Sequence, residues 1–172
     1  MIIVSDTNIL SSLAAAQALD RLQRLFARST LCIPPSVGDE LRIAVERGRI
    51  YLEVLTTAIT AGEISVLELT EAERALVTTL PRKLGLGECQ AIALCQQRHL
   101  PLLSNDRRAV RYCQTRAIDV VDLPTVLRLF WTRQVATRTE VEQMISRMEQ
   151  VERLTLSAEQ RTAIFASQRR RH

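Results

Sequence analysis

Short apolar runs alternate along the chain with longer segments in which apolar residues recur at helical spacing. The apolar runs predict strands near residues 2–4, 31–33, 64–69, 100–104 and 118–121. The periodic segments predict helices over residues 11–28, 35–47, 71–80, 88–98, 106–114 and 123–131. Residues 50–55 fit either an extended or a helical conformation. Because strands alternate with helices, the pattern predicts an α/β fold built on a parallel sheet.

The last part of the chain contains helical patterns only. A capping box is predicted at residues 139–142, and an apolar stripe follows it at Val141, Ile145, Met148 and Val151. A second capping box at residues 157–160 begins a last helix that is predicted to reach the arginines at 169–171. No repeat or linker separates this part from the rest, so residues 135–172 are expected to be a helical extension of the domain formed by residues 1–134. The stripe either packs within the chain or binds a partner helix or a second subunit, and a homodimer is expected.

Composition narrows the class of protein. Hydrophobic residues make up 47% of the 172, but aromatic residues only 3%, which argues against a platform that stacks nucleic-acid bases. No apolar run approaches the roughly 18 residues that a membrane helix needs, and the first residues lack the basic segment of a signal peptide. The sequence therefore predicts a cytoplasmic protein that does not bind a membrane.

Cysteine and charge add little about chemistry. The four cysteines form no C-x-x-C pair and make no zinc set with the two histidines, so they are expected to be small buried residues. The net charge is +4, and residues 106–172 hold thirteen Lys or Arg against eight Asp or Glu. Nearly every cation is arginine, which suits phosphate recognition, although solvated helix faces explain the same pattern.

Two aspartates follow predicted buried strands. Asp6 comes after the first strand, and Asp106 comes after Leu102-Leu103-Ser104-Asn105. Ligands of open parallel sheets bind beyond the carboxyl ends of the strands, where both aspartates are expected. Each is equally well placed to be the N-cap of the helix that follows it.

Two glutamates lie on helices expected to flank that edge. Glu40 falls at the border of the apolar face of its helix, beside Val37, where a carboxylate either meets a cation or extends outwards to solvent. Glu88 opens a nearly apolar helix after two glycines, where the helix dipole favours a negative charge in any case. Four carboxylates in one crevice repel one another unless cations are bound, and oxygen ligands suit Mg²⁺ or Mn²⁺. Such ions activate water for phosphodiester cleavage.

These residues resemble a known family. Asp6-Thr7-Asn8 after an initial strand, Glu40 in Pro-Ser-Val-Gly-Asp-Glu-Leu, Glu88 in Gly-Glu-Cys-Gln-Ala-Ile-Ala-Leu and Asp106 in Leu-Leu-Ser-Asn-Asp are similar in order and spacing to the PIN domain, from residue 1 to about residue 130. The resemblance implies a three-layer α/β/α, Rossmann-like sheet and a Mg²⁺- or Mn²⁺-dependent endoribonuclease. Many bacterial members are VapC-type toxins that a small antitoxin inhibits.

The resemblance also implies roles for particular residues. Asp6, Glu40, Glu88 and Asp106 would be the catalytic metal ligands, and Thr7, Asn8, Ser104 and Asn105 the polar neighbours that orient them. Arg107, Arg108 and Arg111 would contact RNA phosphates, or else form the exposed face of their helix. Two features depart from the family: such toxins are usually shorter, and many relatives have Asp where this chain has Glu88.

Two other functions are compatible with parts of the sequence. One is a catalytically silent PIN-like module that binds RNA or a protein. The other is a haloacid-dehalogenase-like phosphatase, which also opens with a strand and an Asp, but in that class a second Asp usually stands where this chain has Asn8.

Overall fold

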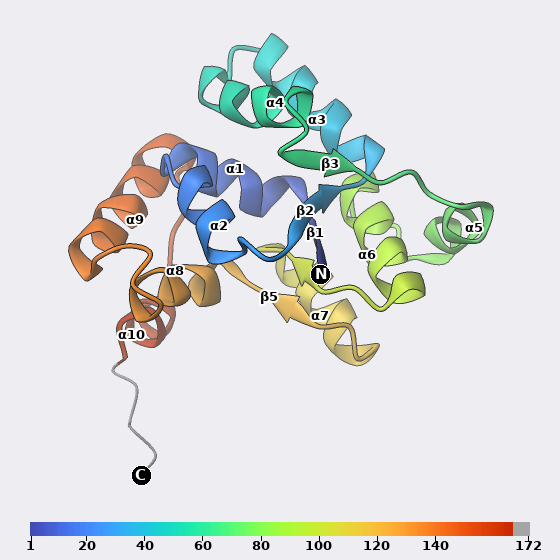
Figure 1. Cartoon of the computed structure of the whole chain (residues 1–172). Coiled ribbons are helices and arrows are strands. Elements are labelled where there is room, and N and C mark those ends of the chain that lie inside the picture. The colour runs from blue at the N-terminus through green and yellow to red at the C-terminus, as the bar shows by residue number, and fades with distance from the viewer. Residues whose placement is uncertain (167–172) are drawn as a thin grey trace.

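The computed structural model describes residues 1–166, and it shows an α/β fold with a five-stranded parallel sheet (Figure 1). The strands are β1 (Ile2–Ser5), β2 (Thr30–Ile33), β3 (Ile64–Val66), β4 (Leu102–Leu103) and β5 (Val120–Val121). The helices are α1 (Thr7–Ala15), α2 (Leu19–Leu25), α3 (Pro35–Glu46), the 3₁₀ turn η1 (Ile50–Leu52), α4 (Glu53–Thr60), α5 (Glu71–Thr79), α6 (Leu86–Arg98), α7 (Arg107–Thr115), α8 (Leu123–Thr132), α9 (Arg138–Glu152) and α10 (Ala158–Phe165). The predicted fold class is confirmed.

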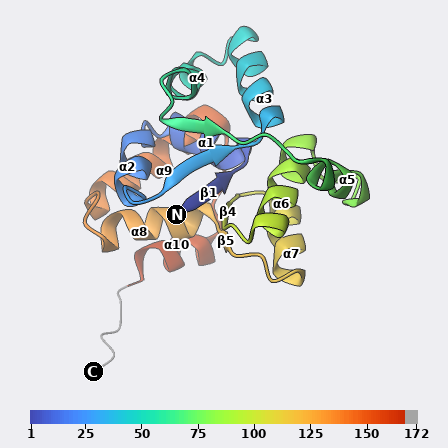
Figure 2. The same cartoon turned by 45° about the vertical axis from the view of Figure 1, so that its right-hand side comes forward.

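The strand order is β3-β2-β1-β4-β5, which puts the N-terminal strand in the middle of the sheet. Val4 pairs with Cys32 of β2 on one side and with Leu102 of β4 on the other. Helices cover both faces: the turned view shows α1, α2, α8 and α9 on one side of β1, and α6 and α7 on the other (Figure 2). Each face has its own apolar cluster, which explains why Val4 can be wholly buried.

The first helical segment differs from the prediction. Instead of one helix over residues 11–28, α1 begins at Thr7 and ends at Ala15, and α2 follows. The break lies at Gln17, whose φ of 56° is left-handed and cannot continue a helix. The strand expected over 64–69 ends at Val66, and the ambiguous residues 50–55 form η1 and the start of α4.

Part of the prediction for the C-terminal helices is wrong. The capping box of α9 is made by Thr137 and Glu140, and not by the predicted pair at 139 and 142. The apolar stripe packs within the chain, but Met144 belongs to it and Val151 is 48% exposed. The capping box at Ser157 is confirmed. That helix, α10, ends at Phe165 rather than at the predicted arginines, and Arg169–Arg171 lie outside the described residues.

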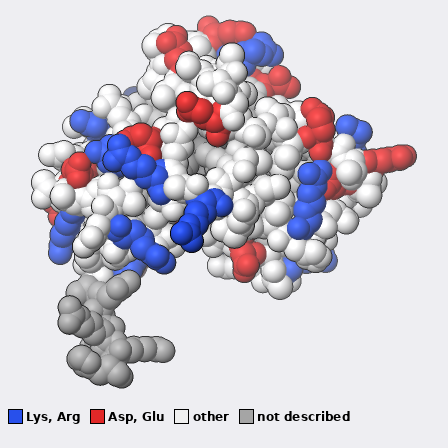
Figure 3. All heavy atoms as spheres, viewed as in Figure 1, with Lys and Arg blue, Asp and Glu red and all other residues white. Residues whose placement is uncertain are grey.

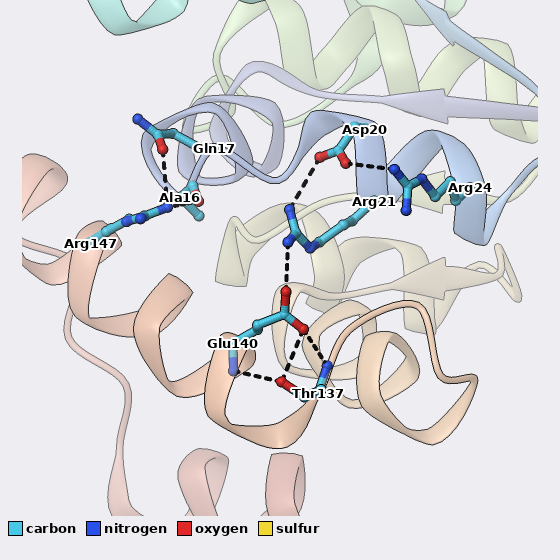
Figure 4. Close-up of polar contacts among 8 residues, drawn as sticks. All are labelled: Ala16, Gln17, Asp20, Arg21, Arg24, Thr137, Glu140 and Arg147. Atoms are coloured by element: carbon cyan, nitrogen blue, oxygen red, sulfur yellow. Dashed lines mark hydrogen bonds and ion pairs between the residues drawn. The ribbon is translucent and has the colours of Figure 1, made fainter.

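Polar contacts as well as apolar packing fix α9 against the N-terminal helices (Figure 4). The guanidinium of Arg21 pairs with Glu140 at 2.9 Å, and Arg147 donates to the side chain of Gln17 at 3.0 Å. On the same helix, Val141 and Met148 are wholly buried in the apolar cluster that also contains α1. The extension is therefore packed onto α1, the helix that follows Asp6.

The other side of the sheet holds a buried ion pair that the sequence pattern did not single out. Glu73 completes the predicted capping box with Thr70 at the start of α5. Its carboxylate also receives hydrogen bonds from Nε and Nη2 of Arg98 at 2.6 and 2.8 Å, at only 2% exposure. The four cysteines are buried and unpaired, as predicted.

Candidate active site

Asp6 lies at the carboxyl end of the central strand and is wholly buried. Its side chain caps α1 by accepting the N–H of Ile9 at 3.1 Å, and it also accepts a hydrogen bond from the hydroxyl of Ser104. The backbone N–H of Asp6 donates to the carbonyl of Leu103 at 3.2 Å, which brings the ends of β1 and β4 together. The capping role predicted for Asp6 is thus present, and it does not remove the side chain from the edge of the sheet.

Asp106 is joined to Asp6 through Ser104. Asp106 caps α7, because its carboxylate accepts the N–H groups of Arg108 and Ala109, both at 2.8 Å. Its own N–H donates to the hydroxyl oxygen of Ser104 at 3.2 Å, and that hydroxyl donates to Asp6. One wholly buried serine therefore links the carboxylate of Asp6, at the end of β1, to the backbone of Asp106, which follows β4.

The two glutamates face the start of α1 from α3 and α6. Glu40 is exposed, as the outward-extending alternative predicted, but its carboxylate accepts a hydrogen bond from the hydroxyl of Thr7. The amide nitrogen of Asn8 donates to Glu88 at 3.2 Å. Thr7 and Asn8, which directly follow Asp6, thereby contact the two glutamates, and the orienting role that the resemblance implies for them stays a prediction.

Gly87 allows α6 to approach Glu40 closely. A Cβ added at Gly87 would lie 3.0 Å from Oε1 of Glu40 and 3.1 Å from Cγ2 of Val37, which is tighter than ordinary van der Waals contact. A larger residue at position 87 would therefore have to displace the carboxylate of Glu40 or the side chain of Val37 by a few tenths of an ångström.

The pKa values show that the acids share one electrostatic environment. Burial raises the pKa of Asp6 to about 7, and the negative charges of Glu88 and Asp106 add to that rise. The pKa of Glu88 is also raised, first by burial and then by the charges of Glu40 and Asp106. Hydrogen bonds from Ser104 and Ile9 oppose the rise at Asp6 without cancelling it. Burial and neighbouring negative charges thus make Asp6 and Glu88 costlier to ionise, and a bound cation would reverse that cost.

The donor set fits a hard divalent ion in its chemistry, but the side chains are not arranged around one. All four acids offer carboxylate oxygens, and the groups between them are hydroxyls and an amide. Within residues 1–166, no three His, Cys, Asp or Glu side chains lie close enough to hold a single ion. Thr7, Asn8 and Ser104 occupy the carboxylate oxygens instead.

The predicted RNA-contacting arginines diverge. Arg108 reaches over the α5–α6 connection, where its Nη1 donates to the carbonyl of Lys83 at 3.1 Å. Arg107 and Arg111 remain exposed and border a cavity that also touches Asn105. On the face shown in Figure 3, acidic and basic side chains are interspersed, so charge there does not mark a ligand site.

A cavity of about 510 Å³ adjoins the acids and contains residues that the sequence did not point to. Asn8 and Asp106 border it, together with Arg49 and the segment Glu152–Leu154 at the end of α9. These residues are far apart in the chain and belong to no local motif. No sequence signal brings Arg49 and Arg153 to the site: the packing of η1 against α1 places Arg49 there, and the packing of α9 onto α1 places Arg153.

The family model described as DUF3368, PIN domain, matches residues 2–168. The chain belongs to this PIN-domain family. None of the curated proteins matches it.

Two solved structures share the PIN fold of this chain. VapBC2 from Rickettsia felis, in a crystal structure with a DNA fragment from its promoter, is 17% identical with a TM-score of 0.52, and the match covers 71% of this chain and 98% of that chain. PAE2754 from Pyrobaculum aerophilum is 18% identical with a TM-score of 0.50, covering 75% and 98%. At these identities the likeness concerns the fold, and part of this PIN domain has no counterpart in either structure. None of the described helices is both long and apolar enough to cross a membrane.

Proposed function

We propose that this PIN domain is a Mg²⁺- or Mn²⁺-dependent endoribonuclease whose site is formed by Asp6, Glu40, Glu88 and Asp106. The observation that carries the proposal is Asp6, a wholly buried carboxylate placed beside two other acids, with a pKa of about 7. A buried acid in that position lowers the stability of the fold, and a divalent cation is the partner that would compensate it. PIN domains are typically nucleases, which agrees with this chemistry.

Each residue has a distinct part in the proposed site. Asp6 and Asp106 are held by the caps of α1 and α7 and by Ser104, so they provide the rigid side. Glu40 and Glu88 have longer side chains held only by Thr7 and Asn8 and by backbone N–H groups of the α6 start, so they provide the adjustable side. A divalent ion at these carboxylates would supply an activated water and stabilise charge on the phosphate oxygens.

The biological setting is proposed from the structural neighbour. Because the PIN fold of this chain is similar to VapBC2, we infer that the protein acts as the toxin of a toxin–antitoxin pair and that a small antitoxin protein binds it. Its substrate in this setting is RNA. We also propose that the protein is located in the cytoplasm and forms a homodimer.

The test compares two neighbouring acids on α3. Glu40→Gln is expected to lower Mn²⁺-dependent cleavage of total RNA by about a hundredfold or more, a loss typical of catalytic groups. Asp39→Asn is the matched control, because Asp39 is 68% exposed and its only ion pair within residues 1–166 is with Arg42 at 3.7 Å. Both positions are exposed, so neither change should unfold the protein.

A calorimetric titration with Mn²⁺ separates the nuclease from the silent module. Uptake of Mn²⁺ by the wild type that Glu40→Gln weakens supports the nuclease. If the wild type binds no Mn²⁺ and cleaves no RNA, the acids are structural and the chain is a silent PIN-like module. Equal cleavage by Glu40→Gln and Asp39→Asn would contradict the assignment of Glu40.

A further inference from the structure

A groove lined by arginines, and also by Asp106, Glu152 and Asp122, runs past the candidate active site, and its outer wall is formed by the C-terminal extension. The cavity of about 510 Å³ beside Asp106 continues into a second one of about 400 Å³, and the two share Asn105 and Leu154. The connection from α9 to α10 borders both cavities. The groove therefore lies between the PIN core and the extension.

Four arginines line this groove, two in each cavity. Arg49 and Arg153 border the first cavity, and Arg107 and Arg111 border the second. All four are exposed, and none makes an ion pair or a side-chain hydrogen bond with another residue of the described chain. By contrast, Arg21, Arg42 and Arg98 are all paired with acids. The groove thus gathers guanidinium groups whose donors are available to a ligand.

A network of hydrogen bonds fixes the wall that carries Arg153. The carboxylate of Glu152 accepts hydrogen bonds from the hydroxyls of Ser11, Ser12 and Tyr51, at 2.7 Å from Ser12 and 3.0 Å from Tyr51. Ser11 and Ser12 are at most 7% exposed and belong to α1, the helix that Asp6 caps. The end of α9 is therefore held to the same helix that positions the acids, which sets Arg153 at a defined place beside them.

We propose that Arg49 and Arg153 bind phosphates of single-stranded RNA next to the acidic site, and that the C-terminal extension is part of the substrate-binding surface. Four guanidinium groups that form no ion pair within residues 1–166 match the backbone of a polyanion. Tyr51 is the aromatic residue of the first cavity wall, and its hydroxyl is already bonded to Glu152. The groove therefore recognises the backbone and supplies affinity and register rather than base selection. This inference rests on the proposed ribonuclease function.

Binding is measured without divalent ions, so that it does not depend on cleavage. The probe is a fluorescently labelled single-stranded RNA of mixed sequence, and anisotropy is recorded in a chelator over a range of salt concentrations. Arg49→Gln with Arg153→Gln is expected to weaken binding about tenfold and to reduce the slope of log affinity against log salt by about 1.4, as for the loss of two contacts to single-stranded phosphates.

The control removes two positive charges at the end of the sheet where the strands begin, opposite the acids. Arg28 precedes β2, and Arg133 follows α8, a helix that runs away from the carboxyl edge, so neither lies near the acids. Arg28→Gln with Arg133→Gln should leave the affinity and its salt slope close to those of the wild type. Arg153→Gly is a second test, because Arg153 has a φ of 54° that glycine adopts without strain. That variant is expected to keep the fold, so weaker binding by it reports the lost guanidinium.

The outcomes distinguish the RNA-binding proposal from the nuclease proposal. RNA binding that is weakened in Arg49→Gln with Arg153→Gln, the groove variant, and kept in the control supports RNA binding by the groove, even if Mn²⁺ produces no cleavage. Equal binding by the groove and control variants overturns it, even if the wild type cleaves RNA. A wild type that binds no RNA in chelator also overturns it.

Discussion

Replacing Asp6 with asparagine is expected to stabilise the metal-free protein at neutral and alkaline pH. The side chain is wholly buried, and burial raises its pKa from the ordinary 3.8 to about 7. An amide of the same shape has no charge to desolvate. It still accepts the N–H of Ile9, because one side-chain oxygen remains.

The magnitude follows from that pKa and from one hydrogen bond. The difference between 3.8 and about 7 corresponds to roughly 4 kcal/mol of unfolding free energy, at about 1.4 kcal/mol per pH unit. The hydroxyl of Ser104 donates to Asp6 and loses that acceptor in the variant, which costs about 1–3 kcal/mol for a buried donor. The net gain above pH 7 is therefore about 1–3 kcal/mol.

The sign of the effect changes with pH. An acid whose pKa is raised by folding holds its proton more tightly in the folded state, so its favourable contribution is complete below 3.8. That contribution is lost as the pH rises towards about 7 and stays constant above it. The variant lacks this titration, so it should be less stable than the wild type in acid and more stable in alkali.

Urea unfolding followed by circular dichroism tests this, in chelator, at about pH 4.5 and about pH 8.5. Asp39→Asn controls for the loss of an exposed charge and should differ little from the wild type. Added Mn²⁺ should stabilise the wild type and leave Asp6→Asn unchanged. A variant less stable than the wild type at about pH 8.5 would refute the reasoning, because Asp6 would then not be a costly buried charge.

Two further predictions concern α6. Arg98→Met leaves the carboxylate of Glu73 buried without its partner, so the free energy of unfolding at neutral pH should fall by about 2–3 kcal/mol, below the cost for a fully buried pair because Arg98 is 31% exposed. The pair lowers the pKa of Glu73, so this difference should shrink in urea unfolding as the pH falls below 4.5, and a constant difference would contradict the pairing. Gly87→Ala should lower RNA cleavage about tenfold by displacing Glu40, because Val37 is wholly buried and cannot yield. Its unfolding free energy should change by less than about 1 kcal/mol, since alanine favours the helix, and unchanged cleavage would speak against the close approach.

Local patterns in the sequence were sufficient for the fold class and for the position of the acids along the chain. Apolar runs and period-3.6 spacing predicted the order of strands and helices, because strands buried on both faces are continuously apolar and helices buried on one face repeat apolar residues at helical spacing. Asp6 and Asp106 were identifiable because each follows an apolar strand, and the carboxyl ends of parallel strands meet at one edge. The family resemblance joined Glu40 and Glu88 to them.

Local patterns failed where a single backbone angle or a distant contact decides the outcome. The break at Gln17 depends on a left-handed backbone angle, and the cap at Thr137 on an extended one. The neighbouring residues in the sequence do not predict either angle. The burial of Glu73 depends on Arg98, a residue on another helix.

The sequence by itself determined that this chain forms a parallel α/β fold with acids at the ends of its strands, since these are properties of segments a few residues long. Only the tertiary structure decided the pKa of Asp6, because that pKa depends on burial and on charges contributed by two other elements. It alone also placed Arg153 at the site, since Glu152 meets the hydroxyls of Ser11 and Ser12 across about 140 positions of the chain. Contacts over that separation are set by how whole helices pack, and no short motif encodes them.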